Sequence, residues 1–166
     1  MEVSASSLGI DLSHDSAGWY KWLLACFLVG KRIRSSVALA AYHALVVGIG
    51  LDTSAKLASC PHRTLVRQLG SAGYARYDES TARRLHALGG RLQSEMANYL
   101  DLNVKVDAAR LSQWLLSFDG IGPKTLEIFM RELHSAPRCI NYIFRGMPRA
   151  EWRCTRRPTI VVLENR

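Results

Sequence analysis

The sequence lacks several features that would assign it to a membrane or metal-binding class. No apolar run in its 166 residues reaches the roughly 20 positions that a membrane-spanning helix needs, and the longest, Trp22–Gly30, ends at Lys31. No two of the four cysteines are close enough to form a Cys-x-x-Cys pair, which argues against a zinc site or an iron–sulfur cluster. We therefore expect ordinary thiols, no metal, no cofactor and no membrane partner.

A secretory signal is also lacking, because residues 1–9 contain no basic region followed by an apolar stretch. This pattern favours a cytoplasmic protein. We expect it in the nucleoid-associated space of a bacterial or archaeal cell, and we expect a monomer.

Acidic residues are scarce, with 14 against 22 lysines and arginines, for a net charge of +8. Such a balance favours a polyanionic partner such as nucleic acid. Seven arginines and only two acidic residues fall within residues 136–166, so this tail carries +5 and the remaining 135 residues carry +3. Because the excess is concentrated in the tail, charge alone does not decide the partner.

Convincing strand patterns are absent from residues 1–134, and helical periodicity predicts an all-α domain there. Residues 135–166 form an arginine-rich, irregular tail with three prolines, in which only residues 159–163 have a strand-like pattern. The expected helices start near Ser13–Ser16 and then cover residues 37–47, 53–58, 61–69, 78–100, 107–118 and 123–134.

The most informative segment is Phe118–Thr125, where an apolar helix runs into Asp-Gly-Ile-Gly-Pro-Lys-Thr. Gly120 and Gly122 permit a tight turn and leave no Cβ between the backbone and a ligand. Ile121 can turn inward and fix the turn to the core. Pro123 is a preferred first helical residue, so the free N–H groups after it face outward at the positive end of a helix. This arrangement predicts a phosphate site, although a turn used only for packing is the alternative.

This segment resembles the hairpin of the helix-hairpin-helix DNA glycosylase superfamily, in its lysine-bearing endonuclease III branch. The resemblance extends over Trp19–Leu133: residues 22–45 are similar to the family's early helix pair, and residues 69–92 to the turn and helix before the hairpin. It implies a helix-hairpin-helix glycosylase-like helical domain that binds double-stranded DNA. Gly120, Ile121, Gly122 and Thr125 would contact the DNA, with Lys31 and Arg32 where relatives place a DNA-inserting residue.

For Lys124 the resemblance implies a nucleophile that attacks the sugar C1′ of a flipped-out nucleotide and forms a Schiff base. A lysine attacks only when it is deprotonated, and both a helix N-terminus and partial burial favour the neutral amine. The alternatives are a surface lysine that touches phosphate and a salt bridge to Glu127, three positions along the helix.

The sequence also departs from the family. Relatives carry a catalytic aspartate after the second hairpin helix, but residues 135–145 contain no acidic residue. The four-cysteine loop of many relatives is absent too. Asp119 lies near the hairpin, where we expect it to cap the turn. Three functions follow: a base-excision repair glycosylase with a lyase step, a non-catalytic helix-hairpin-helix module that binds the DNA backbone without sequence preference, and a helical scaffold whose basic tail binds protein or RNA.

Overall fold

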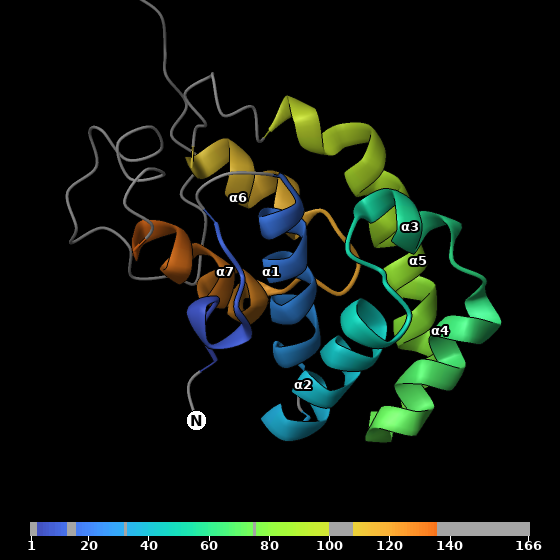
Figure 1. Cartoon of the computed structure of the whole chain (residues 1–166). Helices are drawn as coiled ribbons and strands as arrows, with labels where there is room; N and C mark the ends of the chain where they lie inside the picture. Colours follow the sequence, from blue (N-terminus) through green and yellow to red (C-terminus); the bar gives the residue numbers. More distant parts are fainter. Residues whose placement is uncertain (1–2, 13–15, 32, 75, 100–107, 136–166) are drawn as a thin grey trace, which may run out of the picture.

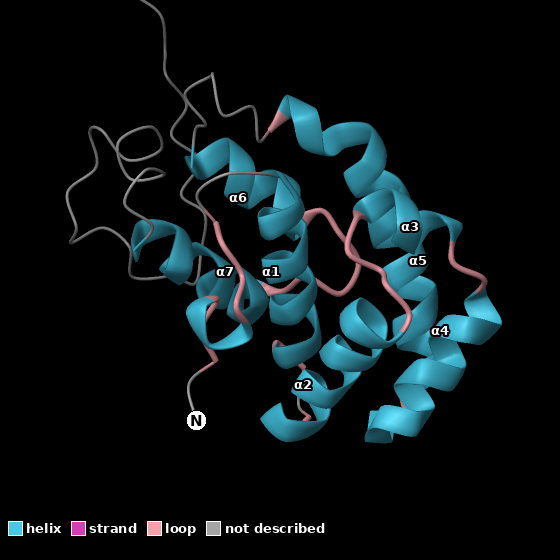
Figure 2. Cartoon of the chain, viewed as in Figure 1, coloured by secondary structure: helices cyan, strands magenta, loops and turns pink. Residues whose placement is uncertain are grey.

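The computed structural model describes residues 3–12, 16–31, 33–74, 76–99 and 108–135, and these contain α-helices and no strand (Figure 2). The expected all-α class is confirmed for this part of the chain. Arg32, the strand-like residues 159–163 and nearly all of the expected tail lie outside the described residues. The helices are α1 (Ser16–Val29), α2 (Ser35–His43), α3 (Ser54–Ser59), α4 (His62–Leu69), α5 (Asp78–Glu95), α6 (Ala108–Leu116) and α7 (Pro123–Ser135).

Helix α1 is the centre of the structure. All seven residues from Trp22 to Leu28 are at most 3% exposed, so this helix is covered on every side. It packs against α2 and α7, and Figure 1 shows it in the middle of the view, beside α7. The long apolar run in the sequence is therefore a central core helix.

Helix α5 packs against α3 and α4. Its inner face consists of Leu85, Leu88 and Leu92, as the helical spacing predicted. Gly89 lies on the same face, where a Cβ would come within 2.8 Å of the backbone nitrogen of Ala58. The close approach of α3 to α5 therefore requires a glycine at this position.

Several helix ends differ from the predicted ones. Helix α2 ends at His43, and the chain then makes a π-helical turn over Ala44–Gly48, where we expected a helix to residue 47. This wider turn lets both Leu45 and Leu51 enter the core, and Leu51 N–H donates to Leu45 O at 2.9 Å. Helix α5 ends at Glu95, before a short 3-10 turn, whereas the predicted helix ran to residue 100.

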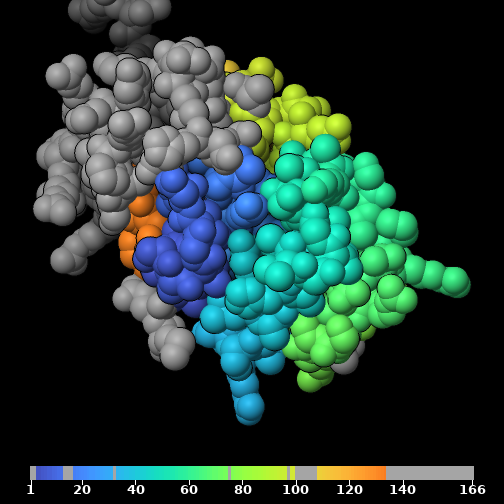
Figure 3. Space-filling model, in the orientation of Figure 1, coloured from blue at the N-terminus to red at the C-terminus, as the bar shows by residue number. Residues whose placement is uncertain are grey.

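Helix α7 is fastened to α1 and to the start of the chain. The indole N–H of Trp22 donates to Phe129 O at 3.2 Å, and Arg131 Nη2 donates to Val3 O at 3.0 Å. Figure 3 shows the N-terminal segment, in blue, on the surface next to α7, in orange. The hairpin that precedes α7 is thus mounted on a rigid helix. None of the described helices has the length and apolar character needed to span a membrane.

Candidate functional site

The segment between α6 and α7 forms a tight turn. Ile121 N–H donates to Phe118 O at 3.1 Å, which closes a four-residue turn. Gly120 occupies its third position with φ +94°, a conformation that side chains with a Cβ avoid. Phe118 and Ile121 are both buried, so the prediction that Ile121 turns inward and fixes the hairpin is confirmed.

The two hairpin glycines have different surroundings. A Cβ on Gly120 would meet the ring of Phe27 at 2.8 Å and Lys31 Nζ at 3.0 Å, so this glycine faces the end of α1. Among the residues that the structure describes, a Cβ on Gly122 would meet nothing within 4 Å beyond its chain neighbours, so this glycine faces open space there. Gly120 therefore serves the packing of the hairpin, while Gly122 leaves the outer side of the hairpin bare.

Helix α7 begins on this bare side. Its first α-helical hydrogen bond runs from Leu126 N–H to Gly122 O, at 3.0 Å. The N–H groups of Lys124 and Thr125 precede that bond and have no acceptor within the helix. Lys124 is exposed, whereas Thr125 is buried with its side chain against Gly30, so the accessible backbone at this helix end is that of Lys124. At the positive end of α7, Lys124 is therefore the exposed residue whose N–H lacks an acceptor within the helix.

The Lys124 amine lies at the surface. Its Nζ donates to both carboxylate oxygens of Glu127 at 3.1 Å, and its side chain is 67% exposed. The salt bridge that the sequence left as an alternative is therefore formed. The partial burial expected for a nucleophile is absent. Residues 136–145, most of the segment in which relatives carry an aspartate, lie outside the described residues.

Lys31, predicted to bind DNA, fastens the hairpin to α1. Its Nζ donates to Gly120 O at 2.7 Å and lies 4.5 Å from the centre of the Phe27 ring. Burial lowers the pKa of Lys31, the positive charge of Arg84 lowers it further, and Asp119 acts in the opposite direction. Lys31, Arg84 and Asp119 thus form one electrostatic cluster beside the turn.

Asp119 differs from the expected turn cap. Its Oδ2 accepts a hydrogen bond from Arg84 Nε at 3.0 Å, and among the described residues we find no bond from this carboxylate to the turn backbone. The carboxylate is 74% exposed, and the Arg84 side chain is 39% exposed. The ion pair therefore joins α5 to the tip of the hairpin at the surface.

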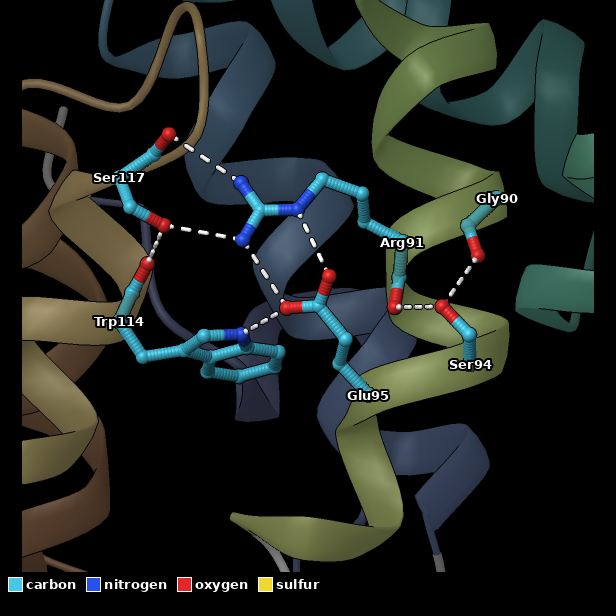
Figure 4. A network of polar contacts seen from close by, with 6 residues as sticks. All are labelled: Gly90, Arg91, Ser94, Glu95, Trp114 and Ser117. Atoms are coloured by element: carbon cyan, nitrogen blue, oxygen red, sulfur yellow. Dashed lines mark hydrogen bonds and ion pairs between the residues drawn. The ribbon is translucent and has the colours of Figure 1, made fainter.

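A second arginine of α5, Arg91, holds the start of the hairpin (Figure 4). Its Nη1 donates to Ser117 O at 3.1 Å, its Nη2 to Ser117 Oγ at 3.0 Å, and its guanidinium lies 4.0 Å from the centre of the Phe118 ring. Glu95 binds the same guanidinium through both oxygens and also accepts from the indole N–H of Trp114 at 2.7 Å. The bonds from Arg91 and then from Trp114 lower the pKa of the Glu95 carboxyl.

Three cations, two from α5 and Lys31 just after α1, therefore occupy hydrogen-bond acceptors of one short turn: the carbonyls of residues 117 and 120 and the carboxylate of residue 119. Sequence reasoning missed this arrangement. Only the Arg91–Glu95 spacing of four positions signals part of it.

No family model, curated protein or solved structure matches the chain.

The chemistry of the site follows from its described residues alone. They offer the exposed helix N-terminus at Lys124, a glycine with open space beside it and a surrounding set of cations, which together suit a phosphate group. No group of three or more His, Cys, Asp or Glu residues in the described part of the chain is arranged to hold a metal ion.

Proposed function

We propose that this protein binds the sugar–phosphate backbone of double-stranded DNA through its hairpin, residues 118–125, as a helix-hairpin-helix domain of the DNA glycosylase type. The observation that carries the proposal is the exposed start of α7, where Lys124 has an N–H without an acceptor within the helix and lies near Gly122, whose Cβ position has open space around it among the described residues. A phosphate can approach this backbone closely, and the helix dipole favours its negative charge.

Such binding would not depend on base sequence, because backbone N–H groups that contact phosphate read no base edges. It would weaken as salt rises, since each neutralised phosphate releases counterions and contributes about −0.9 to the slope of log K against log salt. The Pro123 ring has no N–H to offer, so the contact would come from the N–H of the next residue of α7, Lys124.

A first experiment places a carboxylate where the phosphate would bind. In the Gly122→Asp variant the new side chain can accept from the N–H groups of Lys124 and Thr125 as a helix N-cap, so the thermal midpoint should stay the same or rise. Duplex binding should fall by at least about tenfold, because the N–H groups are occupied and a like charge faces the DNA.

Fluorescence anisotropy with a labelled duplex of arbitrary sequence, between 50 and 200 mM salt, measures this change. Ala55→Asp is the matched control, because it adds the same charge to the first turn of α3, at an exposed position. A folded Gly122→Asp protein that binds as well as wild type overturns the proposal. If wild type does not bind duplex, or binds it independently of salt, the scaffold function is favoured instead.

A second candidate function is base excision with a lyase step, in which Lys124 is the nucleophile. The observation that favours it is the position of this amine, in the first turn of α7 beside the proposed phosphate site. The Glu127 ion pair would have to open and the amine lose a proton before Nζ could bond to C1′ and the base depart. Borohydride trapping on duplex with an abasic site tests this: an adduct in wild type that disappears in Lys124→Ala supports catalysis, and no adduct despite intact binding supports the non-catalytic module.

A further inference from the structure

The ion pair between Arg84 and Asp119 has a cost for a site that binds phosphate. The Asp119 carboxylate is mostly exposed at the tip of the hairpin, three positions before Gly122, where the bare backbone starts. A fixed negative charge at this place would repel an approaching phosphate. A nearby cation that can bind the phosphate would offset this repulsion.

Arg84 is suited to bind an incoming phosphate in this way. The recorded pair joins its Nε to a single carboxylate oxygen, whereas a guanidinium has five N–H donors. Exposed pairs with one hydrogen bond are weak and exchange their partners readily. Lys31 is close enough to Arg84 for the two charges to repel one another, so a second anion between them would relieve that repulsion.

Arg91, two helical turns further along the same face of α5, provides a contrast. Its guanidinium binds both oxygens of Glu95 and also both oxygens of Ser117. Its donors are thus engaged inside the protein. Arg91 positions the hairpin, and Arg84 is the arginine of this face that remains exchangeable.

We propose that Arg84 is a further phosphate-binding residue of the hairpin site, and that it exchanges the Asp119 carboxylate for a backbone phosphate when duplex DNA binds. The inference rests on the proposed function, since the phosphate is the one adjacent to the α7 contacts. It extends the DNA-binding surface from the hairpin onto α5. In the free protein Asp119 holds the arginine at the hairpin, next to the site.

The salt dependence of duplex binding tests the exchange. In Arg84→Gln the slope of log K against log salt should become shallower by about 0.9, the value for one lost phosphate contact. In Arg91→Gln the slope should stay at the wild-type value, whatever happens to affinity. Arg84→Lys keeps the charge, so its slope should also stay at the wild-type value.

Asp119→Asn supplies a second measurement, because it frees Arg84 without removing it. This variant should bind duplex several-fold more tightly than wild type, and the gain should shrink when Arg84→Gln is also present. Circular dichroism identifies the folded variants, and if Arg84→Gln fails to fold, Arg84→Met, which also removes the charge, takes its place in both measurements.

The outcomes separate this inference from the proposed function. If wild type binds with a clear salt slope but Arg84→Gln leaves that slope unchanged, Arg84 makes no phosphate contact and only this inference is overturned. The inference is also overturned if Asp119→Asn raises duplex affinity by the same factor with and without Arg84→Gln. The gain would then come only from removing the repulsion between the Asp119 carboxylate and the DNA. If wild type does not bind duplex, both are overturned.

Discussion

The two glycines of the hairpin allow a sharp test, because alanine at each position should have opposite consequences for stability. At Gly120 the φ of +94° would strain an alanine by about 1–2 kcal/mol. The new Cβ would also lie 2.8 Å from the Phe27 ring, which is fully buried and cannot move aside, and such overpacking costs about 1–3 kcal/mol. We therefore expect Gly120→Ala to lower the free energy of unfolding by about 2–5 kcal/mol.

At Gly122 the backbone is not in the left-handed region, and the new Cβ would meet open space. The remaining effect of Gly122→Ala is the weaker N-cap preference of alanine, so its cost should stay below about 1 kcal/mol. The same methyl group should weaken duplex binding, because it stands where a phosphate would approach.

Urea titrations followed by tryptophan fluorescence measure both free energies, and a thermal scan should show a lower midpoint for Gly120→Ala by roughly 4–20 °C. Adding Lys31→Met to Gly120→Ala should restore only a small part of the loss, because the Phe27 ring is the rigid obstacle. If Gly120→Ala is as stable as Gly122→Ala, the reasoning about the turn is refuted.

Three further predictions concern the core and the pH dependence. Gly30→Ala should destabilise by about 1–3 kcal/mol, because its Cβ would lie 2.0 Å from Thr125 Oγ1, and Thr125→Ala should restore part of that loss in a double-mutant cycle by urea titration. The pKa of Glu95 is lowered in the folded protein, so the Glu95 carboxylate stabilises the fold above its unfolded pKa of 4.5. This stabilisation is lost as the pH falls through the folded pKa. Glu95→Gln should therefore make the free energy of unfolding less dependent on pH between pH 3 and 5. Burial raises the pKa of Tyr42 to about 12 and that of Tyr74 still higher, so above pH 10 only the unfolded chain releases these protons and stability should fall; a flat profile from pH 9 to 11.5 would contradict this.

The sequence sufficed for features that depend on neighbouring residues. Helical spacing located the buried face of α5, and turn chemistry located the hairpin with Ile121 inward, although it did not say that Gly120, and not Gly122, would have the positive φ. The helix expected over residues 53–58 is found as α3, although Thr53 caps it with its side chain instead of forming its first turn. Each of these depends on residues within about four positions of one another.

The contacts around the hairpin could not be predicted in the same way, because they join distant parts of the chain. Lys31 and Gly120 are 89 positions apart, and Arg84 and Asp119 are 35 apart. Resemblance to relatives suggested that Lys31 touches DNA, whereas its amine is bound to the hairpin. The exposure of Lys124 was also unpredictable, since it depends on how α7 sits on α1.

The central place of α1 has a consequence for synthesis of the protein on the ribosome. Trp22 finds its hydrogen-bond acceptor on α7, 107 positions later, so the chain must grow by that length before the partner helix exists. At about 5–20 residues per second, translation takes roughly 5–20 s to cover this interval. During that time the most apolar helix of the chain lacks one of its covering neighbours, and it is the segment that a chaperone would be expected to shield on the nascent polypeptide.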